Sequence, residues 1–196
     1  MSERRAHEVR IIGGQWKRSR LPVADRPGLR PSPDRVRETL FNWLGQDLGG
    51  WRVLDAFAGS GALGFEAASR GAASVRLLEQ DAALVRSLQA SKARLGADVV
   101  AIERADALAW LARGPRGHFQ LIFLDPPFGA GLHAQAIERA APLLAEGGFL
   151  YVESDEALPD PPQGLEAFRQ GRAGAVHHGL WRRRYTAPAA SQGMSP

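Results

Sequence analysis

From residue 51 onward, short apolar segments alternate with segments whose apolar residues recur at helical spacing, and this alternation constrains the fold more than any other feature of the chain. A repeated strand–helix order with apolar strands is typical of a parallel sheet whose two faces are covered by helices. The sequence therefore predicts an α/β fold built on a mostly parallel sheet.

The same pattern gives the expected extent of each element. We expect seven strands, at 51–57, 74–80, 99–106, 119–125, 148–154, 166–172 and 177–186. We expect helices at 33–46, 81–95, 107–113 and 133–146, and one more between the glycine-rich loop and Gly71. The first helix should start with Ser32 as N-cap and Pro33 at its first position. Residues 8–21 predict two further short strands around Gly13-Gly14, an N-terminal β-hairpin.

A glycine-rich loop follows the first strand of the alternating region. Gly59, Gly61 and Gly64 give the spacing G-x-G-x-x-G between a strand that ends near Asp55 and the next helix. Alone this spacing is a weak signal, and its usual interpretation is a dinucleotide site with a pyrophosphate at the helix N-terminus. Asp55 would repel a pyrophosphate, but it suits a ligand with an amino group or a positive charge.

Two more strands end in acids. Glu79 lies about 20 residues beyond Gly59, the distance at which an acid binds ribose hydroxyls in dinucleotide-binding folds, and Asp106 ends the third strand. Parallel strands share one carboxyl edge, so the three acids should line one site. Such a site fits a nucleoside with an ammonium group and no phosphate, as in S-adenosylmethionine (SAM). An NAD(P) oxidoreductase is the alternative, although the sequence offers it no convincing proton donor.

The fourth strand ends in Asp125-Pro126-Pro127-Phe128. An exocyclic amine on a nucleobase is a poor nucleophile because its lone pair is delocalised into the ring. Two acceptors for its N–H hydrogens would help the nitrogen to pyramidalise: the Asp125 carboxylate and a backbone carbonyl held by the prolines. Phe128 offers a stacking face for the base, worth about 1–3 kcal/mol. The alternative is an ordinary turn that ends a strand.

Positive charge is concentrated near the N-terminus. Residues 1–37 hold ten Arg or Lys and four acids, a net charge of +6, whereas the whole chain carries +4. The remainder therefore carries −2, and a basic arm on such a body favours a polyanionic partner such as nucleic acid. A lone hairpin is marginally stable in water, so this one must pack on the body or on a ligand.

The composition and patterning of the chain argue against metal-binding, membrane-spanning and secreted proteins. The chain contains no cysteine, and no pair among its five histidines has the spacing of helical zinc ligands, so we expect no metal site. Its apolar runs are too short for a transmembrane helix, and its N-terminus lacks the apolar core of a signal peptide. We expect a cytoplasmic protein without a membrane partner.

The motifs together resemble known methyltransferases. The stretch DAFAGSGALG with Glu79 and Asp106 is similar to the SAM site of class I methyltransferases, and DPPF resembles the (Asp/Asn)-Pro-Pro-(Tyr/Phe) motif of amino-methyltransferases. The ordered blocks VRIIGGQWKRSRL, LRPSPDRVRETLFNWL, VLDAFAGSGALGFEAASRGA and FLDPPF resemble the bacterial 16S ribosomal RNA guanine-N2 methyltransferases across residues 9–186. The block RPSPDRVRETLFN is the most distinctive of them.

This resemblance implies the organisation and partners of the chain. It implies a basic arm with a β-hairpin at 1–31, a Rossmann-like class I methyltransferase domain at 32–186 and a disordered tail at 187–196. SAM would be the cofactor. The substrate would be 16S rRNA in a 30S subunit or assembly intermediate, methylated at the exocyclic N2 of a guanine, guanine 966 in the family. The enzyme would act as a monomer without a metal.

The expected site residues form three groups, assigned from the motifs and the resemblance. The catalytic group is the motif Asp125, Pro126, Pro127 and Phe128. The cofactor group is Asn42, Asp55, Ala56, Phe57, Gly59, Ser60, Gly61, Glu79, Gln80, Asp106 and Ala107. The RNA-binding group is Arg10, Lys17, Arg18, Arg35 and Arg37. The sequence gives no role to Arg182, Arg183 and Arg184, which would also suit a solvated strand edge.

Two other functions remain open at this level. A DNA amino-methyltransferase, acting on adenine N6 or cytosine N4, would use the same pocket, although such enzymes usually add a target-recognition domain for which the chain has little room. A non-catalytic RNA-binding assembly factor would not bind SAM. Protein glutamine methyltransferases are a weaker match, because their motif resembles Asn-Pro-Pro-Tyr.

Overall fold

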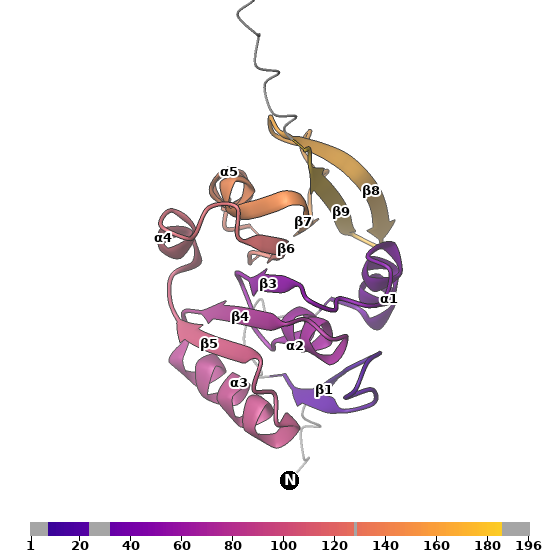
Figure 1. Ribbon diagram of the computed structural model, residues 1–196, viewed down its shortest axis with the longest axis vertical. Helices are drawn as coiled ribbons and strands as arrows, with labels where there is room; N and C mark the ends of the chain where they lie inside the picture. Colours follow the sequence, from indigo (N-terminus) through magenta and orange to yellow (C-terminus); the bar gives the residue numbers. More distant parts are fainter. Residues whose placement is uncertain (1–7, 24–31, 128, 186–196) are drawn as a thin grey trace, which may run out of the picture.

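The computed structural model describes residues 8–23, 32–127 and 129–185 (Figure 1). The expectations for Phe128, for residues 1–7 and 24–31 of the basic arm and for the tail at 187–196 lie outside the described residues and stay predictions. Within the described residues, no helix is long and apolar enough to cross a membrane.

Seven strands form one sheet in the spatial order β5-β4-β3-β6-β7-β9-β8, and this confirms the predicted Rossmann-like fold. They are β3 (Arg52–Asp55), β4 (Ser74–Glu79), β5 (Val100–Arg104), β6 (Phe119–Leu124), β7 (Leu144–Ser154), β8 (Leu165–Ala173) and β9 (Val176–Arg183). β3 to β7 pair in parallel, and β9 runs antiparallel between β7 and β8. The chain leaves β3 first toward β4 and later returns to β6 on its other side. This reversal creates the switch point where open α/β sheets bind ligands.

Helices cover both faces of this sheet (Figure 1). They are α1 (Asp34–Trp43), α2 (Ala62–Ser69), α3 (Ala82–Leu95), α4 (Ala107–Leu111) and α5 (His133–Ala140), followed by the 3-10 helix η1 (Ala141–Leu143). Successive side chains of a strand point to opposite faces of the sheet, so they contribute to two separate hydrophobic cores. Val53 packs with α1, α2 and α3, whereas its neighbour Leu54 packs with α4 and α5. The central strands β3, β6 and β7 therefore carry apolar side chains on both faces.

Three predicted helices end earlier than expected, and the shortest of them, predicted at 107–113, ends at Leu111. The helix predicted at 33–46 ends at Trp43, where Gly45 and Gln46 adopt positive φ angles of 90° and 71°. The helix predicted at 133–146 ends at Ala140, and the chain tightens into η1 around Pro142 before β7 begins at Leu144. A proline inside a helix removes one backbone donor and clashes with the preceding turn, so it favours this early end.

The N-terminal strands pair as predicted, but their connection differs. β1 (Glu8–Arg10) and β2 (Arg20–Pro22) are antiparallel, yet residues 11–19 lie between them, so Gly13-Gly14 is not a two-residue hairpin turn. The connection instead crosses the end of α2. The main-chain N–H groups of Gln15 and Trp16 donate to the carbonyl and hydroxyl oxygens of Ser69, at 2.8 and 2.9 Å.

This segment belongs to the main core. Ile11 and Leu21 are completely buried in the cluster that also holds Phe41 of α1 and Phe65 of α2. Burying a side chain of this kind contributes about 1.5–3 kcal/mol. The expectation that the hairpin leans on the body is therefore confirmed.

Gly14 allows the close approach to α2. Its φ is 73°, and a Cβ atom at this position would lie 1.8 Å from the carbonyl oxygen of Ser69. Backbone atoms at the end of a helix cannot move aside as a flexible side chain can. Only glycine meets both conditions here.

We expect Gly14→Ala to lower the free energy of unfolding by about 1–3 kcal/mol, because the added methyl group overpacks the contact with α2. Denaturant unfolding measures the change. Gly45→Ala is the matched control, since Gly45 has a φ of 90° but nothing within 4 Å of its added Cβ. An equal loss in both variants would show that backbone strain alone, and not the contact with Ser69, explains the effect.

Candidate active site

The carboxyl ends of the parallel strands surround a cavity of about 410 Å³ beside the switch point. Its walls come from the segments that follow β3, β4, β5 and β6, together with Ser32 and Leu132. The strand ends contribute Asp55, Glu79, Asp106 and Asp125, so four acids from four strands face one space. This is the shared edge that the sequence predicted.

Glycines allow the loop after β3 and the start of α2 to pack closely against the sheet. Gly61 is the N-cap of α2, with a φ of 78°. A Cβ at Gly64 would lie 2.1 Å from a methyl carbon of Leu77 and 3.1 Å from the Asp55 carboxylate. The Gly64 N–H donates to that carboxylate at 3.0 Å. A protein carboxylate therefore occupies the start of α2, where a dinucleotide fold would bind a pyrophosphate.

The next two acids are also fixed by backbone donors. Glu79 accepts hydrogen bonds from the N–H groups of Gly59 at 3.0 Å and Asp81 at 2.8 Å. Asp106 caps α4 by accepting from Ala109 N–H at 2.7 Å. Each carboxylate keeps further lone pairs for a ligand. This set of acceptors fits a ligand with hydroxyl, amino and cationic groups, as SAM has, and would repel a phosphate.

Asp55 is the most deeply buried of the acids that line the cavity, with 2% of its surface exposed. Burial raises the pKa of Asp55 to about 7, opposed by the Gly64 hydrogen bond and reinforced by the negative charge of Glu79. A carboxyl group with this pKa changes charge close to neutral pH. A cation bound beside it would favour the ionised form.

Asp125 directly follows β6, and the strands on either side of β6 each carry a carboxyl group near the same edge of the sheet. Asp55 lies on β3 to one side and Glu153 on β7 to the other. Burial raises the pKa of Asp125 well above its usual range, and the charges of Glu153 and Asp55 raise it further. No donor within the described residues forms a hydrogen bond to Asp125, so its carboxyl oxygens are available to a substrate.

Sequence reasoning missed Glu153 and assigned the wrong role to Ser32. Ser32 is not the N-cap of α1, which is Pro33 without a side-chain hydrogen bond. The Ser32 hydroxyl instead donates to Glu153 at 2.5 Å, and the Tyr151 hydroxyl donates to the same carboxyl oxygen at 2.8 Å. Glu153 could have been found as a further acid near the end of a parallel strand, the rule that identified Asp55 and Glu79.

Most of the predicted cofactor group lines the cavity. These residues are Asp55, Ala56, Phe57, Gly59, Ser60, Glu79, Gln80, Asp106 and Ala107, and Pro126 and Pro127 join Asp125 there. Asn42 does not, since it is exposed on α1 and hydrogen-bonds to Gln46. Gly61 shapes the loop but does not line the cavity. Phe128 lies outside the described residues.

The predicted RNA group divides into surface and interior residues. Arg10, Lys17, Arg18 and Arg35 are exposed. Arg37 is completely buried, so the expectation that it contacts RNA is wrong. Its guanidinium donates to the carbonyl oxygens of Ser32 at 3.2 Å and Arg10 at 2.9 Å.

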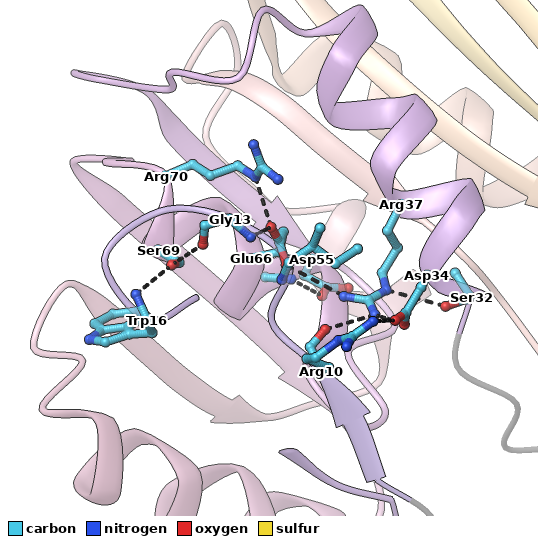
Figure 2. A network of polar contacts seen from close by, with 12 residues as sticks. Arg10, Gly13, Trp16, Ser32, Asp34, Arg37, Asp55, Glu66, Ser69 and Arg70 are labelled. Carbon is cyan, nitrogen blue, oxygen red and sulfur yellow. Dashed lines mark hydrogen bonds and ion pairs between the residues drawn. The ribbon is translucent and has the colours of Figure 1, made fainter. Parts of the chain in front are cut away.

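The contacts of Arg37 continue into a buried network that holds the N-terminal segment (Figure 2). Glu66 of α2 lies 3.5 Å from Arg37 and 2.8 Å from Arg70. Its two oxygens also accept hydrogen bonds from the main-chain N–H groups of Ile12 at 2.7 Å and Gly13 at 2.8 Å. Arg37 is therefore a structural residue that ties α1 to both α2 and the N-terminal strand.

We expect the affinity for SAM to rise about tenfold between about pH 5.5 and pH 7, because Asp55 must lose its proton before it can attract a cation. The pKa of about 7 places this titration in that window. Isothermal titration calorimetry with SAM across the pH range measures the effect. Asp55→Asn should bind more weakly and with a flat profile, and a variant that kept the slope would disprove the assignment to Asp55.

The fold and the acids gathered at its switch point are those of a Rossmann-like methyltransferase.

Comparisons with known proteins agree with this class. A family model described as conserved hypothetical protein 95 matches residues 9–182. The chain is 44% identical over 184 residues to ribosomal RNA small subunit methyltransferase D of Escherichia coli K12, covering 90% of each. It is 39% identical over 186 residues to the protein of that name from Haemophilus influenzae, covering 89% of this chain and 93% of that protein. The solved structure of Escherichia coli yhhF has a TM-score of 0.82 at 41% identity, covering 91% of this chain and 99% of that one.

The chain therefore belongs to the family of the ribosomal RNA small subunit methyltransferases D, and this confirms the resemblance drawn from its motifs.

Proposed function

We propose that the protein transfers a methyl group from SAM to the exocyclic N2 of a guanine in 16S rRNA, guanine 966 by family resemblance, during small-subunit assembly. The observation that carries the proposal is the position of Asp125. Its carboxyl group, which accepts no hydrogen bond from the described residues, shares one cavity with the three acids that suit SAM. Methyl donor and amine acceptor would therefore meet in a single space. The rRNA substrate follows from the relatives named above.

SAM, when bound, supplies an electrophilic methyl group on a sulfonium centre. Glu79 would accept hydrogen bonds from the ribose hydroxyls, and Asp106 would bind near the adenine amino group. Asp55 would attract the positive charge of the methionine part. These roles need no movement of the acids, because backbone N–H groups already hold all three.

Asp125 and the main-chain carbonyl of a neighbouring proline would accept the two hydrogens of the guanine amine. The nitrogen lone pair then attacks the methyl carbon, so that the N–C bond forms as the C–S bond breaks and its electrons stay on sulfur. The nitrogen becomes positively charged and acidic, and Asp125 takes up the proton that it loses. A high pKa makes Asp125 a stronger base for this last step. Phe128 remains the proposed stacking face for the base.

The exposed basic residues of the N-terminal segment would bind the RNA backbone. Lys17 and Arg18 lie on the connection between β1 and β2, and Arg10 lies on β1. Arg35 is exposed on the first turn of α1, two residues before the buried Arg37. The segment is docked on α1 and α2, so these charges have fixed positions relative to the cavity. We propose that the enzyme acts in the cytoplasm as a monomer.

We expect Asp125→Ala to reduce methyl transfer at least about a hundredfold while SAM binding is retained, because the acceptor and base is lost but the other acids remain. Labelled SAM with immature 30S particles measures transfer, and calorimetry measures binding. The exposed acid Asp160, outside the cavity, gives the control Asp160→Ala. Full activity in Asp125→Ala would disprove the mechanism. Transfer to duplex DNA instead of the particles would identify a DNA amino-methyltransferase.

We expect Lys17→Ala combined with Arg18→Ala to weaken RNA binding and to reduce the slope of log affinity against log salt by about 2, because two phosphate contacts are lost. Filter binding at several salt concentrations measures the slope. The pair Arg113→Ala and Arg116→Ala removes the same charge from exposed positions between α4 and β6 and should leave the slope unchanged. An unchanged slope in the first pair would exclude the connection as an RNA contact.

A further inference from the structure

Glu153 is a buried carboxyl group with no role in the reaction steps proposed above. It lies near the end of β7, the strand beside β6, and only 2% of its surface is exposed. Its side chain does not line the cavity, but the hydroxyl-bearing residue that it binds, Ser32, does. Burying an acid here is costly, so its retention calls for a physical reason.

Glu153 connects two segments that form the wall of the cavity. Its carboxyl group binds the Ser32 hydroxyl just before α1, and its main-chain carbonyl hydrogen-bonds to a ring nitrogen of His133 at 2.8 Å. His133 begins α5 directly after Leu132, another residue that lines the cavity. One residue of β7 thus holds both sides of the space next to Asp125.

The carboxyl groups of Glu153 and Asp125 differ in the hydrogen bonds that they accept. Glu153 has two hydroxyl donors, and the nearby charge of Arg37 also favours its ionised form. Asp125 has no hydrogen-bond donor among the described residues. Burial raises the pKa of both groups, but the three stabilising partners of Glu153 make it the more acidic of the two. When the pair holds one proton, Asp125 carries it.

We propose, on the basis of the function proposed above, that Glu153 is a positioning residue for methyl transfer. It fixes the cavity wall through Ser32, and its negative charge keeps Asp125 basic enough to take up the proton released by the methylated amine.

The surrounding groups are consistent with a negative Glu153. The charged or titratable side chains around it come from neighbouring elements: Arg37 on α1, Asp55 on β3, Asp125 just after β6, His133 on α5 and His178 on β9, with Tyr151 on its own strand. The Arg37 guanidinium supplies a permanent positive charge to this set. Burial lowers the pKa of His178, the residue paired with Glu153 across the two strands, so its imidazole is neutral near pH 7 and adds no competing charge.

The test replaces Glu153 by its neutral isostere, Glu153→Gln. We expect the acidic limb of the rate–pH profile to move down by about 1 pH unit, because a negative neighbour of Asp125 is removed. We expect the plateau rate to fall about tenfold, because Asp125 becomes a weaker base. Ser32→Ala should also lower the plateau, and Ser32→Thr, which keeps the hydroxyl, should restore it. If Glu153 served only the fold, its substitution would change the melting temperature and the amount of active enzyme, but it would not move the acidic limb of the rate–pH profile.

A second measurement separates this inference from the identity of the substrate. Carbon-13 NMR of the carboxyl groups, with Asp125→Asn to assign the signal, follows the titration of Asp125 in the protein without RNA. A lower midpoint in Glu153→Gln supports the inference even if wild-type enzyme fails to methylate 16S rRNA, an outcome that would overturn only the proposed substrate. The inference is overturned if Glu153→Gln leaves the midpoint of the Asp125 titration unchanged, or if the variant is active and the acidic limb of its rate–pH profile does not move.

Discussion

A carboxylate buried between two arginines is the interaction on which the rest of the structure depends. Glu66 has no exposed side-chain surface, and without compensation a buried charge would be strongly unfavourable. Arg37, Arg70 and two main-chain N–H groups supply that compensation from α1, α2 and the N-terminal segment. Removing one partner from such a network typically costs about 3–5 kcal/mol, since it leaves the other charges unpaired. The network therefore specifies how these three parts pack as well as stabilising them.

The same network extends to the chemistry of the site. The Arg37 guanidinium donates to the main-chain carbonyl of Ser32 (Figure 2). The Ser32 hydroxyl in turn donates to the carboxyl group of Glu153, which lies beside Asp125. The surface where we place RNA and the cavity where we place the methyl donor are thus linked by a short series of buried polar contacts. Asp55 and Asp125 lie close to other carboxyl groups at one edge of the sheet, where burial and the neighbouring negative charges raise the pKa of both. A cationic ligand relieves this repulsion, and this explains why unfavourable charges can be retained in the site.

Much of the fold could be predicted because its signals are local. Apolar alternation and glycine spacing placed the strands, and acids at strand ends placed most of the cavity. The exceptions depend on contacts between distant residues. Gly13-Gly14 has the composition of a hairpin turn, but its conformation is set by Ser69 of α2. Arg37 looks like any other basic residue of the N-terminal region, and only its packing against Glu66 shows that it is internal. Ser32 could not be assigned from its neighbours because its partner is 121 residues away.

The core shared by Ile11, Leu21 and Phe41 makes the N-terminal segment part of one folding unit. Enzymes that carry a separate recognition domain can exchange it and acquire a new target without disturbing the catalytic fold. This chain lacks that freedom, because replacing the segment would expose the apolar surface of α1 and α2. With the RNA-binding role proposed for this segment, a change of target would come from its surface side chains rather than from exchange of a whole domain.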